Sequence, residues 1–348
     1  MVPSPGPGVA GLHSVSAVSA SDAWAVGDFL NGSDSYRTLI EHWNGHRWQV
    51  VPSPNPAGGT SPTDTLAGVV ALSADDVWAV GFYEKTTTSF RTLIEHWNGK
   101  KWSVVASPNS GTGENTLGAV AASGPAAIWA VGYRQATQDA KRRTLIEHWD
   151  GGKWVITPSP NAGSGDNFAF GVAAVSAAQA WAVGSGPVSF TSTLAMRWNG
   201  SAWSVAHTVN PGQGDRFLQS VTAPSPGFAL AVGSDLDGAQ TKTLTERWNG
   251  SAWSLVASPS PGRDYNSLQS VAAPSSSNGW AVGVQRVTPG SRFQTLAERW
   301  NGTTWQAVSI PSPGHADDWL YSVAAVPGHG GFWAVGSSGT ATLTEFHC

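Results

Sequence analysis

One four-letter phrase, WAVG, recurs along the whole chain at an almost constant interval. It begins at Trp24, Trp78, Trp129, Trp181, Trp280 and Trp333, and LAVG at Leu230 occupies the same frame. The intervals are 54, 51, 52, 49, 50 and 53 residues. A period of this size is typical of repeat architectures in which each unit is one supersecondary motif. We number the units one to seven by these anchors and expect residues 1–348 to form a single domain.

Each unit carries four short apolar segments separated by Gly, Asn, Pro and Ser. A run such as LHSVSAV from Leu12 precedes the anchor, and a run such as TLIEHW from Thr38 follows it. An Asn-Gly step then leads to another Trp, as in WNGHRW from Trp43, and Asn-Gly supplies the positive φ of a tight hairpin turn. No segment shows a sustained helical period. The pattern predicts an all-β fold, a seven-bladed β-propeller of four-stranded antiparallel blades.

The phrases AWAVG and LIEHWNGHRWQVV resemble the kelch repeat. In that family a glycine-terminated second strand is followed by an aromatic, a turn and a Trp that opens the fourth strand. WAVG has one glycine where kelch has two, but the resemblance covers essentially the whole chain and implies a propeller. The units also resemble those of secreted bacterial propellers, several of which are lectins, and this likeness implies glycan binding.

Eighteen of the 19 Trp residues occupy three fixed places in the units. Six belong to WAVG, six end the third segment and six open the fourth. Because large aromatic side chains at repeated positions suit packing between neighbouring blades, we expect these indoles to be buried there. A structural role is also expected for the repeated Glu41, Glu95, Glu147, Glu246, Glu298 and Glu345, and for His42, His96 and His148.

Unit seven ends in TLTEFHC, and no Asn-Gly-Trp segment follows it. The N-terminal VPSPGPG matches the residues that follow a fourth segment elsewhere, as in VPSPNPAGG from Val51. The sequence therefore predicts that the N-terminus completes the last blade, which would remove an exposed sheet edge.

The composition excludes several classes of function. The net charge is −4 and no basic run is present, which argues against nucleic acid or an anionic membrane as partner. No apolar stretch approaches the roughly 20 residues of a membrane span, and the first residues lack the features of a signal peptide. Cys348 is the only cysteine, so no disulfide can form within the chain. The 12% of charged residues and the richness in Gly, Ser and Trp favour a bacterial extracellular protein.

The loops between the second and third segments vary from unit to unit. From the WAVG glycine to the Thr of the TL motif, the intervening residues number 10, 10, 11, 8, 9, 11 and 5. In an antiparallel blade these loops share one face with the blade-to-blade connections. Because binding residues are concentrated on loops held by a rigid scaffold, we predict that this face recognises a ligand.

An acidic residue lies shortly before the first strand in six units, and an aromatic follows it in four. The acidic residues are Asp64, Glu114, Asp166, Asp215, Asp264 and Asp317, and the aromatics are Phe168, Phe217, Tyr265 and Trp319. Carboxylates beside flat aromatic faces suit sugars, so the predicted ligand-binding residues are Asp166, Phe168, Asp215, Phe217, Asp264, Tyr265, Asp317 and Trp319. Two alternatives stay open: the carboxylates could cap turns, or they could converge on Ca²⁺.

Catalytic motifs such as GxSxG, HExxH or a P-loop are absent. The leading hypothesis is therefore a secreted, non-enzymatic propeller that binds glycans or a protein surface through its variable loops, as a possible targeting subunit of a larger assembly. A second hypothesis is a hydrolase or lyase with one centre at the channel mouth, built from Asp264, His315, Asp317 and Asp318. The third is a protein-interaction platform without a small ligand.

Overall fold

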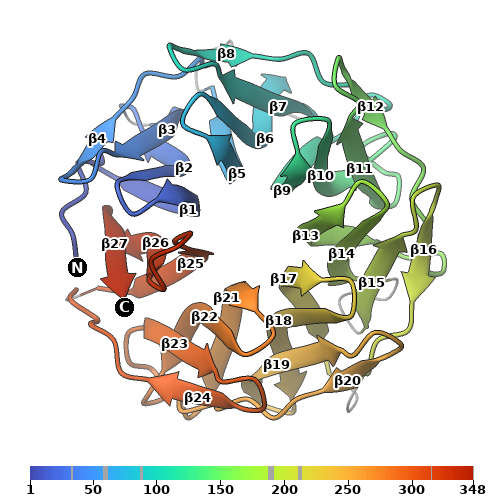
Figure 1. Ribbon diagram of the computed structural model, residues 1–348. Coiled ribbons are helices and arrows are strands. Elements are labelled where there is room, and N and C mark those ends of the chain that lie inside the picture. Colours follow the sequence, from blue (N-terminus) through green and yellow to red (C-terminus); the bar gives the residue numbers. More distant parts are fainter. Residues whose placement is uncertain are drawn as a thin grey trace.

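The chain folds as an all-β propeller of repeated four-stranded antiparallel sheets arranged in a ring (Figure 1). The computed structural model describes residues 1–32, 34–57, 62–86, 89–186, 192–210, 214–314 and 316–347. Four sheets have the orders β1-β2-β3-β4, β5-β6-β7-β8, β9-β10-β11-β12 and β13-β14-β15-β16. Strands β17 to β24 form two further sets of four, joined through one parallel pair, Thr241 with Tyr265. The described part of unit seven contributes the three strands β25-β26-β27.

Each sheet follows the chain from the centre of the ring outward (Figure 1). The innermost strands are β1 (Ala10–Ser19), β5 (Asp64–Ser73), β9 (Asn115–Gly124), β13 (Phe168–Ser176), β17 (Arg216–Ser225), β21 (Tyr265–Ser275) and β25 (Asp318–Ala325). The second strands are β2 (Asp22–Leu30), β6 (Asp76–Thr86), β10 (Ala127–Arg134), β14 (Gln179–Ser185), β18 (Phe228–Asp237), β22 (Asn278–Arg286) and β26 (Phe332–Ser338).

The third and fourth strands form the outer part of each sheet. The third strands are β3 (Tyr36–Trp43), β7 (Ser89–Trp97), β11 (Arg143–Trp149), β15 (Thr193–Trp198), β19 (Gln240–Trp248), β23 (Gln294–Trp300) and β27 (Ala341–His347). The outermost are β4 (Trp48–Val50), β8 (Trp102–Val104), β12 (Trp154–Ile156), β16 (Trp203–Ala206), β20 (Trp253–Leu255) and β24 (Trp305–Val308). Within the described ranges we find no helix with the length and apolarity needed to cross a membrane.

The Asn-Gly steps form the expected hairpin turns between the third and fourth strands. In unit one, Trp43 pairs with Trp48 across the turn, and Gly45 has a φ of 88°. The side chain of Asn44 accepts hydrogen bonds from the backbone N–H groups of His46 and Arg47, at 3.0 and 3.1 Å. A residue with a Cβ rarely adopts this positive φ, which explains the repeated glycine.

The repeated tryptophans pack between neighbouring sheets, which confirms their predicted structural role. The ring of Trp24 in β2 lies 5.0 Å from that of Trp97 and 5.4 Å from that of Trp102, both in the next sheet. Fourteen of the eighteen repeated indoles are buried, and Trp43, Trp97, Trp149 and Trp198 are half-buried. We call these eighteen side chains the indole belt.

The repeated glutamates are completely buried between sheets. Glu147 accepts a hydrogen bond from the hydroxyl of Ser107 at 2.9 Å, and Glu298 accepts one from Ser258 at 2.7 Å, each from the preceding unit. Burial in low dielectric disfavours a carboxylate. It raises the pKa of Glu41 and Glu246 to about 7, and the pKa of Glu95, Glu147 and Glu298 to about 8. Glu147 and Glu298 therefore link neighbouring units, and complete burial keeps the repeated carboxyl groups away from the exposed faces of the ring.

The two ends of the described chain lie side by side (Figure 1). The backbone N–H of Val2 donates to the carbonyl oxygen of Thr344 in β27 at 3.0 Å, as Val51 does to Ile40 in unit one at 2.8 Å. Trp333 of unit seven lies 5.0 Å from Trp43 of unit one. The N-terminal segment therefore contacts β27 at the place that residues following a fourth strand take elsewhere.

Candidate functional site

The glycine of each WAVG motif faces the backbone of the innermost strand at very close range. A Cβ added to Gly27 would collide with the carbonyl oxygen of Gly11, and one added to Gly132 with that of Thr116. The same collision with the innermost strand recurs at Gly81, Gly184, Gly233, Gly283 and Gly336. Only glycine allows the two strands to approach in this way.

A β-bulge lies opposite this glycine in every unit. The pairing of β1 with β2 skips one residue between Leu12 and Ser14, which leaves His13 without a partner across the ladder. The other innermost strands skip a residue at the same place. The seven skipped residues are His13, Ala67, Gly118, Phe170, Gln219, Gln269 and Tyr321, and we call them the mouth ring. Bulges commonly re-aim a side chain near functional sites.

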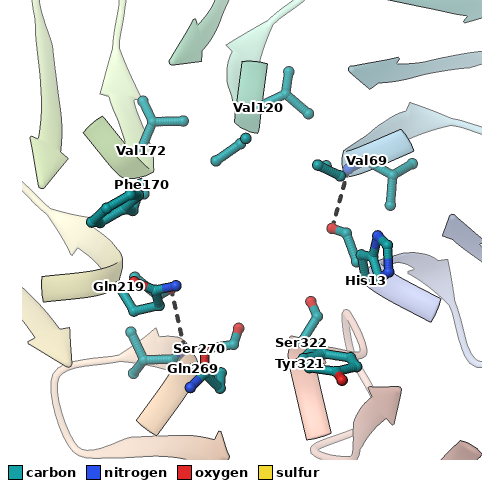
Figure 2. A pocket seen from close by; sticks show the side chains of 18 of the residues that line it. His13, Val69, Val120, Phe170, Val172, Gln219, Gln269, Ser270, Tyr321 and Ser322 are labelled. Carbon is teal, nitrogen blue, oxygen red and sulfur yellow. Dashed lines mark hydrogen bonds between the residues drawn. The ribbon is translucent and has the colours of Figure 1, made fainter. Parts of the chain in front are cut away.

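The mouth ring lines one end of the central channel (Figure 2). All seven residues border a cavity of about 210 Å³. The ring lies toward the start of the innermost strands, on the face that also carries the loops between second and third strands. Hydrogen bonds from Leu30 to Val9 and from Glu84 to Thr63 tie the two kinds of segment together on this face. The channel therefore opens onto the variable-loop face.

The mouth ring is uneven in size and chemistry. Units two and three contribute only Ala67 and Gly118, whereas the other five contribute aromatic, amide or imidazole side chains. Tyr321 meets His13 edge to face at 5.9 Å. A Gln side chain both donates and accepts hydrogen bonds, and aromatic rings offer apolar surface at low entropic cost. The mouth is therefore lined by small residues at units two and three and by larger side chains, able to contact a ligand, at the other five units.

The four predicted aromatic residues fall into two groups on this face. Phe168 stacks on Phe170 at 5.7 Å, and Phe170 meets Phe217 at 6.4 Å. On units six and seven, the ring of Phe293 lies 5.2 Å from Tyr265 and 4.9 Å from Trp319. Phe170 and Phe293, which the sequence analysis did not single out, therefore bridge the predicted residues within each group.

Three of the four predicted carboxylates bind groups of the protein itself. Asp166 accepts the backbone N–H of Arg142 at 2.9 Å, Asp317 that of Phe293 at 2.8 Å, and Asp264 the Nε–H of Arg286 at 3.0 Å. These bonds tie the connections between units to residues 22 to 24 positions away in the sequence, so they are long-range contacts rather than the local turn caps that the sequence left open. Asp215 differs because its side chain is exposed and has no hydrogen-bond partner among the described residues.

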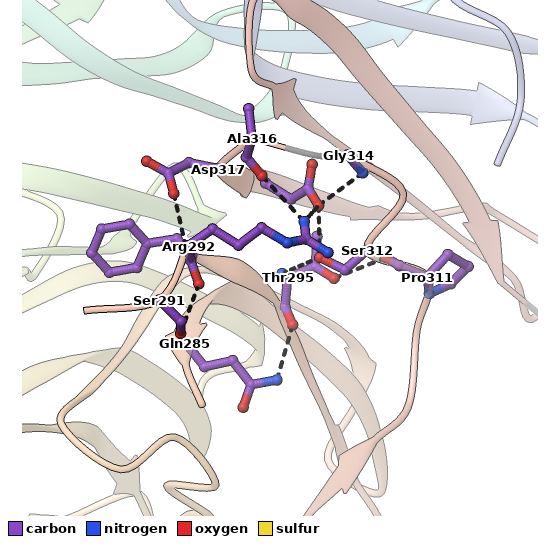
Figure 3. Close-up of polar contacts among 11 residues, drawn as sticks. Gln285, Ser291, Arg292, Thr295, Pro311, Ser312, Gly314, Ala316 and Asp317 are labelled. Carbon is purple, nitrogen blue, oxygen red and sulfur yellow. Dashed lines mark hydrogen bonds and ion pairs between the residues drawn. The ribbon is translucent and has the colours of Figure 1, made fainter. Parts of the chain in front are cut away.

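The described carboxylates of the predicted hydrolase centre, Asp264, Asp317 and Asp318, are held in contacts within the protein, and Figure 3 shows the surroundings of Asp317. Asp318 is buried, and Arg292 donates to its carboxylate at 2.9 Å. Burial acts to raise the pKa of Asp318, but bonds from Ser338, Ser312, the Gly314 N–H and Arg292 together lower it. His315 and Cys348 lie outside the described residues.

No set of three or more His, Cys, Asp or Glu side chains in the described ranges is placed to hold a metal ion. The six carboxylates predicted before the first strands lie in separate units, and all but Asp215 bind backbone or arginine partners within the described part of the protein. The suggested Ca²⁺ site stays a prediction from sequence.

Sequence reasoning missed the mouth ring, although a signal for it was present. In the run before each anchor, the residue that follows the buried Leu or Ala is His, Ala, Gly, Phe, Gln, Gln and Tyr in turn. The residues on either side change little from unit to unit. A single varied position inside a repeated phrase would have marked this place.

Comparisons with known proteins support the fold and give no family. No family model and no curated protein matches the chain. It is similar to a structure described as YCF48 bound to D1 peptide, with a TM-score of 0.58, 14% identity and coverage of 98% of this chain and 94% of the other. A second similar structure is a protein of unknown function from Dyadobacter fermentans, with a TM-score of 0.56, 13% identity and coverage of 86% of this chain and 96% of the other. A third is Chaetomium thermophilum Sqt1 bound to the N-terminus of ribosomal protein L10, with a TM-score of 0.53, 12% identity and coverage of 94% of this chain and 82% of the other. The chain thus shares its propeller fold with these proteins.

Proposed function

We propose that this chain is a non-enzymatic binding propeller that holds a peptide segment of a partner protein across its channel mouth. One observation carries the proposal. A bulge in each innermost strand directs one residue into the mouth, and this residue varies between units while its neighbours repeat. A scaffold that keeps its strands constant and varies the side chains at one opening suits recognition there.

The chemistry of the mouth ring suits an extended peptide. The amides of Gln219 and Gln269 offer donors and acceptors that match the backbone groups of such a segment. Phe170 and Tyr321 offer rigid apolar surface for its side chains. Two of the structures that share the fold are described as peptide complexes, with a D1 peptide and with the L10 N-terminus. These points favour a peptide ligand.

A glycan is the second candidate, and one observation favours it. The exposed carboxylate of Asp215 lies beside the rings of Phe170 and Phe217 in one hollow of the variable-loop face. A carboxylate that accepts sugar hydroxyls next to an aromatic surface is a combination that carbohydrate sites use. Secretion from a bacterium and a role as targeting subunit stay predictions from sequence alone.

We further propose that the propeller has seven blades and that the N-terminal segment closes the ring. The contacts of Val2 with Thr344 and of Trp333 with Trp43 support this, as does the 3.2 Å bond from the Val15 N–H to the hydroxyl of Ser322. Deleting residues 1–4 should lower the unfolding temperature. An unchanged temperature would contradict closure by this segment.

A peptide library tests the binding function. We would pan a phage library of random 12-residue peptides on the wild-type protein and measure the dissociation constants of enriched peptides. The variant Phe170→Ala/Tyr321→Ala should bind them at least about tenfold more weakly, since aromatic anchors dominate such interfaces. The control Val104→Ala/Val205→Ala removes exposed side chains from the outer strands β8 and β16 and should bind normally.

Two results would count against the proposal. Equal binding by the mouth variant and the control would place the ligand elsewhere on the protein. Enrichment of no peptide, together with binding to a glycan array that Phe170→Ala/Tyr321→Ala abolishes, would favour the second candidate.

A further inference from the structure

A hollow of about 330 Å³ lies beside the mouth ring on units four and five. Its lining consists of Phe170, Asp215, Phe217 and Gln219. The two phenylalanine rings stand at 77° to each other, so the hollow is bounded by a ring face and a ring edge. Its volume is at the lower end of the roughly 300–1,000 Å³ of small-ligand sites. The space suits one side chain or a similarly small group.

The carboxylate in this hollow differs from those placed like it in other units. Four units carry an acidic residue at the same place, four residues before the mouth-ring residue: Glu114, Asp166, Asp215 and Asp317. Glu114 accepts two bonds from Arg142 at 3.1 Å, and the other two carboxylates accept backbone N–H groups. Asp215 has no such partner within the described ranges, although it is exposed on the same face.

A repeated arginine is also missing at this place. The residue before the TL motif is Arg37, Arg91 and Arg143 in units one to three. Each reaches the connection of the next unit: Arg37 binds Asp64 at 2.9 Å, and the other two donate to backbone carbonyls at 2.8 and 3.0 Å. In unit four this residue is Ser192. The connection that carries Asp215 therefore receives no guanidinium from the unit before it.

We propose that the hollow binds a cationic side chain, a lysine or an arginine, of the peptide held at the mouth. This inference rests on the proposed function and names the chemistry of its ligand. The ammonium or guanidinium group pairs with the Asp215 carboxylate, as the guanidinium of Arg142 pairs with Glu114 at the equivalent place in unit three. The faces of Phe170 and Phe217 attract the same cation, and the Gln219 carbonyl oxygen accepts one of its N–H groups.

Fluorine NMR of protein that contains 4-fluorophenylalanine tests the proposal. The signals of Phe170 and Phe217 are assigned by single substitutions to leucine. The probes are Nα-acetyl-lysine N-methylamide, its neutral norleucine analogue and methyl α-mannopyranoside. The lysine probe should shift both signals in a saturable manner, and the norleucine probe should not.

Two variants make the test specific to the carboxylate. Asp215→Asn should weaken binding of the lysine probe about tenfold, because it removes the charge while preserving the shape. Asp75→Asn removes the same charge from an exposed turn between β5 and β6 on the opposite face, and should change nothing.

The outcomes separate this inference from the function on which it rests. Equal shifts with the lysine and norleucine probes, or shifts with the mannoside alone, would overturn the cationic site. If library peptides bind the mouth while the lysine probe fails, the inference falls and the binding function stands. If the lysine probe binds and no peptide does, the site stands and the peptide function falls.

Discussion

The indole belt and the mouth ring belong to the same sheets, but residue types repeat between units in the belt and vary between units in the mouth ring. In the belt, each unit repeats nearly the same aromatic residues, and their side chains are buried against the next sheet. In the mouth ring, the units share one backbone irregularity and place different side chains on it. The difference indicates that repetition marks packing in this chain, and that departure from repetition marks recognition.

The glycine opposite the bulge gives the largest expected effect on this comparison. Gly132→Ala would force a methyl group into the carbonyl of Thr116, and we expect a loss of at least about 3 kcal/mol of unfolding free energy. Gly118→Ala, across the same strand pair, is the matched control. An added Cβ there has its nearest contact at 3.9 Å, so stability should stay within about 0.5 kcal/mol.

Urea denaturation of both variants provides the measurement. Similar losses in the two variants would contradict the separation between a fixed frame and a tolerant mouth.

Removing an indole should reduce the unfolding free energy much more in the indole belt than on the variable-loop face. Trp129 is buried between Trp198 and Trp203 of the next sheet, so Trp129→Ala should cost about 3–5 kcal/mol. Trp319, on the variable-loop face, is only half-buried, and Trp319→Ala should cost about 1 kcal/mol. Thermal unfolding followed by tryptophan fluorescence would rank them. A reversed order would break the comparison.

A smaller effect concerns the pH dependence of stability. The pKa of buried Glu147 is about 8 in the folded state and near its ordinary 4.5 when unfolded, so the folded protein binds the extra proton between these values. The contribution of Glu147 to stability should therefore be fully present below about pH 4.5 and decline as the pH rises to about 8. Glu147→Gln should flatten this slope by up to about 1.4 kcal/mol per pH unit.

Unfolding free energies of wild type and Glu147→Gln at pH 5, 6, 7 and 8 test this expectation. The exposed Asp75→Asn serves as a control that leaves the slope unchanged. A stability that rises with pH, or an unaltered slope in Glu147→Gln, would show that this carboxylate is ionised within the fold.

Much of the fold was predictable because the frame repeats. The interval between anchors, the Asn-Gly turns and the fixed places of the indoles together determined the sheets and their order. The bulge was not predictable, because an unpaired residue depends on the register of two strands. It requires no particular residue type at its own position. Its traces are the glycine of WAVG and the one varied position in the repeated run before it, and neither is specific to a bulge, since a glycine in a strand has several causes.

The candidate site was predictable only in part. The sequence placed Phe168, Phe217, Tyr265 and Trp319 on one face, and the structure adds Phe170 and Phe293 between them. Whether a carboxylate is available to a ligand depends on partners that are distant in sequence. Proximity to an aromatic in the sequence therefore could not separate Asp215 from the carboxylates that fix connections.

The most direct test of the central claim replaces all the large side chains of the mouth ring at once. A variant with His13→Ala, Phe170→Ala, Gln219→Ala, Gln269→Ala and Tyr321→Ala would be compared with wild type in thermal unfolding and in binding of the selected peptides. The account predicts a cooperative transition within a few degrees of wild type and loss of peptide binding. Loss of the folded state, or peptide binding that persists at wild-type strength, would contradict it.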